Sequence, residues 1–208
     1  MTETEERFRT AVRGRAKEVE WRSALALPTD YVAREARAAD LIITGTNYDG
    51  SLLDPFRRVD PSSLVMQAGR PAFIVPAEAE WLRLNTVMVA WKDTREARRA
   101  VWDALPLLEQ AKDVSVVEIV EDDTSPTDAR SRVDDVVAWL ASHGIAASGM
   151  VPDGVDSAAE RLETIASGVG ANLIVAGAYG HTRFVEWVFG GVTRDLLTRS
   201  TRCALMAH

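Results

Sequence analysis

The chain repeats part of itself at a fixed distance, and this repeat constrains the fold more than any other feature. Ala39-Asp-Leu-Ile-Ile-Thr-Gly45 returns as Ala171-Asn-Leu-Ile-Val-Ala-Gly177, which sets an offset of 132 residues (171 − 39). The same offset, without a gap, places Leu64-Val65 on Leu196-Leu197 and residues 71–76 on 203–208. Agreement of three segments in one register indicates two related units, each ending in strand, loop, helix and strand.

The later unit alternates between strands and helices. Short apolar or β-branched runs predict strands at 85–91, 114–120, 145–151, 171–177 and 203–208. Apolar residues at helical spacing predict helices at 94–108, 128–142, 155–167 and 192–199, with Thr94 as the N-cap of the first. Such alternation forms parallel β-α-β units with right-handed crossovers. The prediction is therefore an α/β fold with an open, mostly parallel five-stranded sheet and helices on both faces.

The earlier unit is a partial copy. Moving Asn85 back by 132 residues puts its counterpart before Met1, so we expect the chain to open within a helix around Phe8, Ala11, Val12 and Ala16. A strand at 18–25, a helix at 29–38, and strands at 40–45 and 71–76 would complete this unit. The prediction is one partial unit at 1–78 and one complete unit at 84–208, joined by the linker 69–84.

The missing half has consequences for assembly. A misassigned start codon, a fragment, or another element covering the sheet would each account for it. An uncovered edge of a parallel sheet, with its apolar face open to water, promotes association. We therefore expect the isolated chain to form a homo-oligomer, such as a dimer, or to be poorly soluble, with the strand at 40–45 or its neighbour exposed.

Charge and composition exclude several classes of function. The net charge of −7 over 208 residues argues against nucleic acid or an anionic membrane as the main partner. No apolar run approaches the roughly 20 residues of a membrane-spanning helix, and the acidic first residues are unlike a secretory signal. One Cys and no Cys/His cluster predict neither a disulfide nor a metal site. These features predict a metal-free protein of the cytoplasm.

A glycine-rich loop is the candidate ligand site. Gly177 and Gly180 follow a predicted strand, and nine residues later Gly190 and Gly191 open the helix at 192–199. Glycines let backbone amides approach a ligand closely, and the free amides of a helix N-terminus favour an anion. Ligands of open parallel sheets bind beyond the carboxyl ends of the strands, where this loop lies. The pattern predicts a phosphate site, although tight turns and helix–strand packing would require the same glycines.

Other residues of the loop each have a functional and a structural interpretation. Val192 and Thr193 would offer helix N-terminal groups to a phosphate, or Thr193 would bond only its own backbone. Arg183 could pair with a phosphate or be a solvated surface residue. His181 could act at the site or simply face water. The chain has no Gly-Lys-Ser/Thr phosphate loop and no paired carboxylates, so no catalytic residue is predicted, and a slow ATPase is the third hypothesis.

This constellation resembles the universal stress protein family over nearly the whole chain. Nucleotide-binding members are similar to Gly177-x-x-Gly180-(nine residues)-Gly190, followed by Ser or Thr; this chain has Gly191 there and Thr193 two positions on. The resemblance implies a Rossmann-like, adenine nucleotide alpha hydrolase-like fold in tandem. It also implies a stress-response regulator that binds ATP, with Mg²⁺ accompanying the nucleotide.

The resemblance also assigns the other side of the site. The family's opening strand ends in an acidic residue, Gly and Ser, which hold the base and ribose of ATP. Here Lys92-Asp93-Thr94 replaces that triplet, with Lys92 at the acidic position, and Ala90 and Trp91 before it belong to the same adenine and ribose side. Asp93 could take the acidic role, or Lys92 could meet a phosphate.

Tandem members of the family pair the last strands of their two units, which would set residues 71–76 against 203–208. The earlier unit keeps only Gly45 of the glycine pattern, so we expect it to bind no nucleotide. Three departures from the family pattern support a second hypothesis, in which the chain is a scaffold of the same fold that binds no nucleotide. They are the lost glycines of the earlier unit, Lys92 in place of an acidic residue, and Gly191 in place of Ser or Thr.

Overall fold

A computed structural model describes residues 2–46, 56–120, 125–152, 158–179, 196 and 201–208. Its helices are α1 (Glu3–Val12), α2 (Pro28–Glu35), the 3₁₀ helix η1 (Ala36–Ala38), α3 (Pro61–Gln67), α4 (Arg95–Leu108), α5 (Pro126–Ser142) and α6 (Ala158–Gly168). Its strands are β1 (Ile42–Gly45), β2 (Ala72–Val75), β3 (Thr86–Ala90), β4 (Asp113–Val117), β5 (Ala147–Met150), β6 (Leu173–Gly177) and β7 (Cys203–Ala207).

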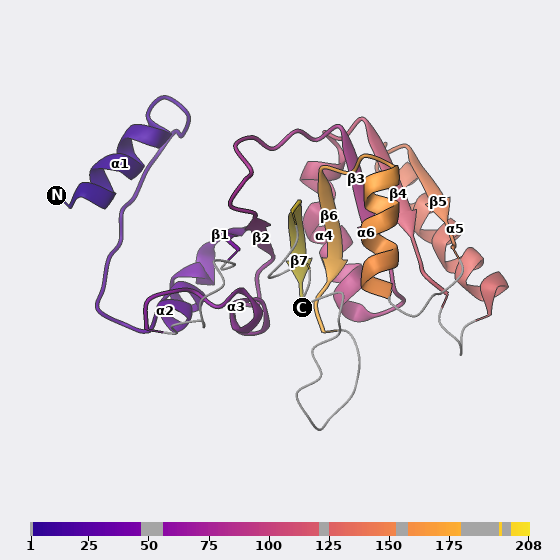
Figure 1. Cartoon of the computed structure of the whole chain (residues 1–208), viewed down its shortest axis with the longest axis horizontal. Coiled ribbons are helices and arrows are strands. Elements are labelled where there is room, and N and C mark those ends of the chain that lie inside the picture. Colours follow the sequence, from indigo (N-terminus) through magenta and orange to yellow (C-terminus); the bar gives the residue numbers. More distant parts are fainter. Residues whose placement is uncertain (1, 47–55, 121–124, 153–157, 180–195, 197–200) are drawn as a thin grey trace, which may run out of the picture.

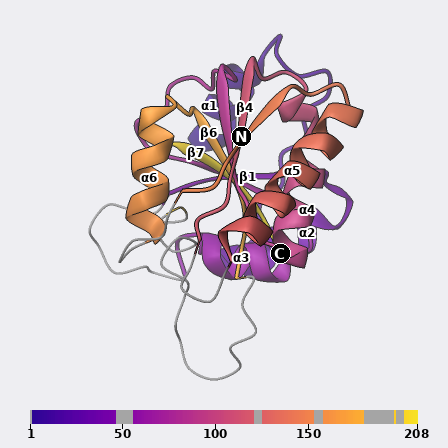
Figure 2. The ribbon, with the colours of Figure 1, turned by 90° about the vertical axis from the view of Figure 1, so that its right-hand side faces the viewer.

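The described strands form one seven-stranded sheet in the order β1-β2-β7-β6-β3-β4-β5 (Figure 1). All neighbours are parallel except β2 and β7, which pair antiparallel. Helices α4 and α5 lie on one face of the sheet and α6 lies on the other (Figure 2). The predicted α/β class with a mostly parallel sheet is confirmed: the five strands predicted for the later unit are β3 to β7, and β1 and β2 extend the described sheet to seven strands.

Each face of the sheet carries its own apolar core. On the α4 and α5 face, Val87 and Val89 of β3 pack with Ala100 and Ala104 of α4, and all four side chains are buried. On the other face, Met88 and Ile174 pack with buried side chains of α6. A strand that is buried on both faces needs a continuous run of apolar residues, and such runs are the sequence signal from which these strands were predicted. The cores hold the carboxyl ends of the central strands in fixed positions.

The sequence offset reappears in the register of the strands. Ile42 of β1 is opposite Ala72 of β2, and 132 residues later Ile174 of β6 is opposite Ala204 of β7. At the antiparallel junction Phe73 is opposite Leu205, its own counterpart in the repeat (73 + 132). An approximate two-fold axis through this pair therefore relates β1 and β2 to β6 and β7. The junction joins the segments at 71–76 and 203–208.

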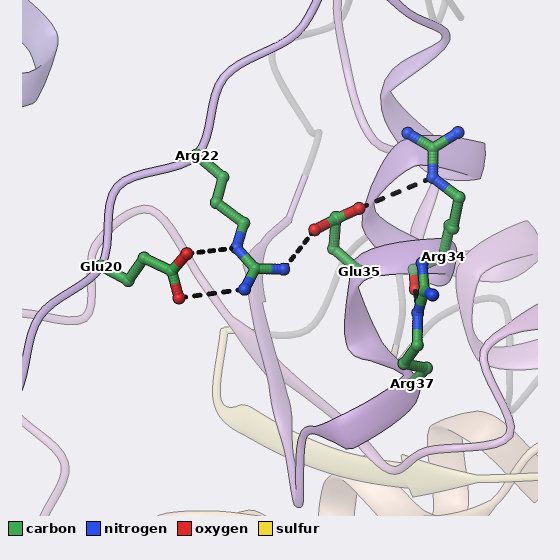
Figure 3. Close-up of polar contacts among 5 residues, drawn as sticks. All are labelled: Glu20, Arg22, Arg34, Glu35 and Arg37. Atoms are coloured by element: carbon green, nitrogen blue, oxygen red, sulfur yellow. Dashed lines mark hydrogen bonds and ion pairs between the residues drawn. The ribbon is translucent and has the colours of Figure 1, made fainter.

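One predicted strand is wrong. The predicted strand at 18–25 is an extended segment that pairs with no strand in the described part of the chain. The side chain of Arg22 instead bonds Glu20 beside it and Glu35 of α2 (Figure 3). A strand forms only where a neighbouring strand bonds its backbone, and Trp21 of this segment packs instead against Phe8 of α1.

The helix boundaries differ slightly from prediction. Helix α1 ends at Val12 and does not reach Ala16, because the backbone leaves the helical region at Arg13, with a ψ of 124°, and Gly14 then takes a left-handed φ of 72°. Helix α5 begins two residues early, where Ser125 caps Asp128. The predicted helix at 192–199 lies outside the described residues except for Leu196. None of the helices in the described part of the chain has the length and hydropathy of a membrane span.

Candidate functional site

The sheet brings together two predicted site segments that are far apart in the sequence. Strands β3 and β6 are parallel neighbours, with Ala90 opposite Ala176, so residues 91–94 and Gly177 emerge at the same edge of the sheet. From this pair the sheet grows in opposite directions, through β4 on one side and β7 on the other. Such a switch point is where open α/β sheets bind ligands.

Gly177 is held tightly against the beginning of α4. A Cβ atom at this position would lie 2.5 Å from the backbone nitrogen of Ala97 and 2.7 Å from the carbonyl carbon of Glu96. No side chain fits there without moving the helix. The sequence left two roles open for this glycine, phosphate binding and helix–strand packing, and the structure shows the packing role at Gly177. The contact brings the N-terminus of α4 to the end of β6.

The first turn of α4 satisfies its own polar groups. The Thr94 hydroxyl accepts a hydrogen bond from the Ala97 amide at 3.3 Å, as predicted for an N-cap. Glu96 in the same turn is only 4% exposed. Burial raises the pKa of the Glu96 carboxyl, but bonds from the Arg95 guanidinium, the Glu96 amide and the Thr94 hydroxyl outweigh burial, so the pKa lies below its usual value. The Glu96 carboxylate is therefore ionised at neutral pH.

Asp93, the predicted acidic residue of the ribose side, already has a partner. Its carboxylate forms an ion pair with Arg98, one turn further along α4. The Asp93 side chain is exposed, so a ligand could reach it by displacing the guanidinium. Lys92 lies half-buried beside it, and its backbone oxygen accepts a bond of 2.7 Å from the Thr94 amide in the turn that leads into α4.

Ala90 and Trp91, predicted for the adenine and ribose side, pack mainly against the two cores of the protein. Ala90 packs against the core on the α6 face, and Trp91 packs against the core on the α4 and α5 face. The Trp91 amide donates to the Val117 oxygen at 2.8 Å, which extends the ladder between β3 and β4. The indole Nε1 is buried and has no hydrogen-bond partner among the described residues.

A buried ion pair at the next strand was not predicted from the sequence. Glu118 follows β4 and is almost completely buried, and Arg132 of α5 bonds both of its oxygens, with Nε at 3.0 Å from Oε1 and 3.3 Å from Oε2. The Glu118 carboxylate raises the pKa of Arg132, and Asp93 adds to this effect. An acidic residue inside the apolar run 114–120 was the signal that could have found this pair.

The end of β6 contacts the earlier part of the chain. Tyr179 has a φ of 60°, a left-handed conformation that bulky residues rarely adopt. Burial raises the pKa of the Tyr179 phenol; the nearby Ser62 hydroxyl lowers it and the Asp60 carboxylate raises it further. Asp60 and Ser62 belong to the start of α3. The first residues of the glycine-rich loop thus pack against the helix that precedes β2.

Most of the predicted phosphate side cannot be placed. Gly177 is described, but the other predicted phosphate-side residues lie outside the described part of the chain: Gly180, His181, Arg183, Gly190, Gly191, Val192 and Thr193. Within the described ranges no group of three or more His, Cys, Asp or Glu side chains could hold a metal ion. In the described half of the site, a ligand could therefore bind the Asp93 carboxylate by displacing Arg98. The N-terminus of α4 lies beside it, packed closely against Gly177.

Neither protein-family models nor curated proteins match the sequence. Solved structures do match its fold. A universal stress protein from Archaeoglobus fulgidus DSM 4304 aligns with 86% of this chain at 15% identity and a TM-score of 0.68. This chain spans 66% of that protein, just under two thirds of its length.

Two further structures agree. A candidate universal stress protein from Pseudomonas aeruginosa UCBPP-PA14 aligns with 98% of this chain and 77% of its own, at 16% identity and a TM-score of 0.62. The protein MJ0577 aligns with 60% of this chain and 96% of its own, at 16% identity and a TM-score of 0.52. At these identities the matches establish the fold, which is that of the universal stress proteins.

Proposed function

We propose that this chain, which has the fold of the universal stress proteins, is a cytoplasmic stress-response regulator that binds ATP or a related adenine nucleotide, with Mg²⁺, beyond β3 and β6. The observation that carries the proposal is the adjacency of residues 91–94 and Gly177 at the switch point of the sheet. Nucleotide sites of open α/β sheets occupy this position. The glycines that continue from Gly177 supply the sequence pattern for the phosphates.

The role of each described residue in this proposal follows from its contacts. Asp93 would accept hydrogen bonds from the ribose hydroxyls after leaving Arg98, since its carboxylate is exposed and its present partner lies on the surface of α4. Thr94 and Gly177 would keep α4 and β6 in place. The output would be a change of conformation or assembly, since within the described ranges no group is placed for fast chemistry.

The experiment is equilibrium dialysis of ATP against wild type and three variants. Asp93→Ala should weaken ATP binding about tenfold or more, the loss expected for a hydrogen bond to a charged group. Arg98→Ala should bind ATP at least as tightly as wild type, because it frees Asp93. Arg99→Ala is the matched control, since Arg99 pairs with Asp103 on the same helix. Failure of wild type to bind any adenine nucleotide would remove the proposal.

The alternative is a scaffold of the same fold that binds no nucleotide. The Asp93–Arg98 ion pair favours it, because a side chain of the protein already occupies the position of the ribose contact. The Thr94 cap favours it too, because it uses the Ala97 amide that an anion would need. A scaffold would show no shift of its melting temperature in saturating ATP, whereas a binder would melt at a higher temperature.

A further inference from the structure

The outer edge of β1 carries unpaired backbone groups. Towards β2, the Ile42 amide donates to the Pro71 oxygen at 3.0 Å and the Thr46 amide donates to the Val75 oxygen at 2.9 Å. Because amides alternate in direction along a strand, those of Ile43 and Gly45 point the other way, towards the open edge. Among the described residues no strand pairs with that edge.

The same edge exposes an apolar side chain at a position that the repeat normally buries. Ile43 is 69% exposed, whereas its repeat counterpart Val175 is completely buried under α4. Among the described atoms, a Cβ atom on Gly45 would meet only the Val75 oxygen, at 3.7 Å, whereas the counterpart Gly177 is closed over by α4. The α4 face of β1 thus has the apolar character of an interior strand without a helix over it in the described part of the chain.

The edge strand is short, but it lacks the charges and the proline that protect many edge strands. Proteins protect such edges with Lys, Pro, bulges or a covering segment. The strand Ile-Ile-Thr-Gly contains no charge and no proline. The extended segment before α2 is held to that helix by the ion pair of Arg22 with Glu35 (Figure 3), and α1 lies apart from the sheet (Figure 1). No segment that the structure describes therefore covers the edge, and its backbone groups can pair with another strand.

We propose that β1 pairs antiparallel with β1 of a second copy, about a two-fold axis through Ile43, so that the two seven-stranded sheets become continuous. The strand is complementary to itself in this register. Ile43 lies beside Ile43 of the other copy, Leu41 is opposite Gly45, and Ile42 is opposite Thr44, so apolar and small residues meet and no like charges do. A second copy is the occupant because the edge of this strand fits its own reversed image.

The molecule already contains one junction of this kind. At β2 and β7, equivalent strands of the repeat pair antiparallel, with Phe73 opposite its counterpart Leu205 on an approximate two-fold axis. The proposed contact would likewise pair equivalent strands about a two-fold axis, at β1, the other strand of the earlier unit. It does not depend on nucleotide binding.

The experiment measures the mass of the full chain in solution by light scattering, over a wide range of concentration. Wild type should be a dimer at high concentration. Ile43→Lys should be a monomer, because two ammonium groups would face each other on the axis, whereas Ile43→Val should remain a dimer. Circular dichroism should give the same folded spectrum for all three proteins, since residue 43 is exposed in the single chain.

A control and a second measurement define the outcomes. Trp102 is an exposed apolar side chain on α4, and Trp102→Lys should remain a dimer. Ile43→Cys should form a disulfide-linked dimer on mild oxidation, because paired residues of this type lie about 5.5 Å apart between Cα atoms, within the range of disulfides. Buried Cys203 should not compete. A monomeric wild type, or an Ile43→Lys variant that still dimerises, would overturn the proposal.

Discussion

Gly177 and Gly45 are counterparts in the repeat, but they differ in what surrounds them. At Gly177 an added methyl group would collide with the backbone of α4, at 2.5 Å from the Ala97 nitrogen. Backbone atoms at the start of a helix that packs on the sheet cannot move aside without moving the helix. We therefore expect Gly177→Ala to lower the free energy of unfolding by about 1–3 kcal/mol or more.

The matched control is Gly45→Ala. Its methyl group would meet one carbonyl oxygen at an ordinary contact distance of 3.7 Å, and its φ is not in the left-handed region. This variant should unfold at nearly the same urea concentration as wild type, or slightly higher because alanine restricts the unfolded chain. Equal effects of the two substitutions in urea titrations would contradict the packing assigned to Gly177.

At the scale of helices, two threonine N-caps form the same hydrogen bond, but only one of the two helices packs into the core. Thr94 caps α4, and Thr2 caps α1, each accepting from an amide three residues on at 3.3 Å. Helix α4 buries residues such as Ala100 and Ala104 in the core, whereas α1 has no buried residue. A cap can stabilise the whole fold only if its helix is part of the cooperative core.

Thr94→Ala should therefore cost about 1 kcal/mol of global stability. Thr2→Ala should leave the global unfolding transition unchanged and should only increase fraying of α1. Thermal or urea unfolding measures the first effect, and hydrogen exchange of the α1 amides measures the second. A loss of global stability in Thr2→Ala would show that α1 packs against the core in solution.

At the scale of the whole molecule, the contact between the extended segment at 18–25 and α2 depends on charge. Hydrogen bonds and the charge of Arg22 lower the pKa of Glu20 and of Glu35, mainly through the bonds (Figure 3). A lowered carboxyl pKa means that the contact stabilises the ionised form. The contact is complete above the ordinary glutamate pKa of about 4.3 and is lost as the pH falls through the lowered values.

Carboxyl carbon NMR should therefore give Glu20 and Glu35 titration midpoints below the ordinary value. Arg22→Gln should return both midpoints towards it. Arg37→Gln is the matched control: Arg37 lies three residues after Arg34 and donates to the Arg34 oxygen, so the two midpoints should not move. Normal midpoints in wild type would show that the segment does not stay on α2 in solution.

Most of the strands and helices that the structure describes after residue 84 were predictable from local pattern. Continuous apolar runs predicted β3, β4, β6 and β7, and helical spacing with the Thr94 cap predicted α4, because these signals depend on neighbours within a few residues. The sequence repeat by itself also predicted that β1 and β6 are equivalent strands. The segment at 18–25 was wrong because a strand exists only where another strand bonds it, and its own residues do not show whether one is available.

Only the tertiary structure decided how the site and the edges are made. The sequence contained Asp93 and Arg98 but not their ion pair, and Gly177 but not the helix backbone against it. Ile43 and Val175 are both apolar strand residues, and only the coverage of the sheet makes one exposed and the other buried. Local propensity acts between neighbours along the chain, whereas burial, pairing and charge contacts depend on distances in space, which the order of strands in the sheet determines.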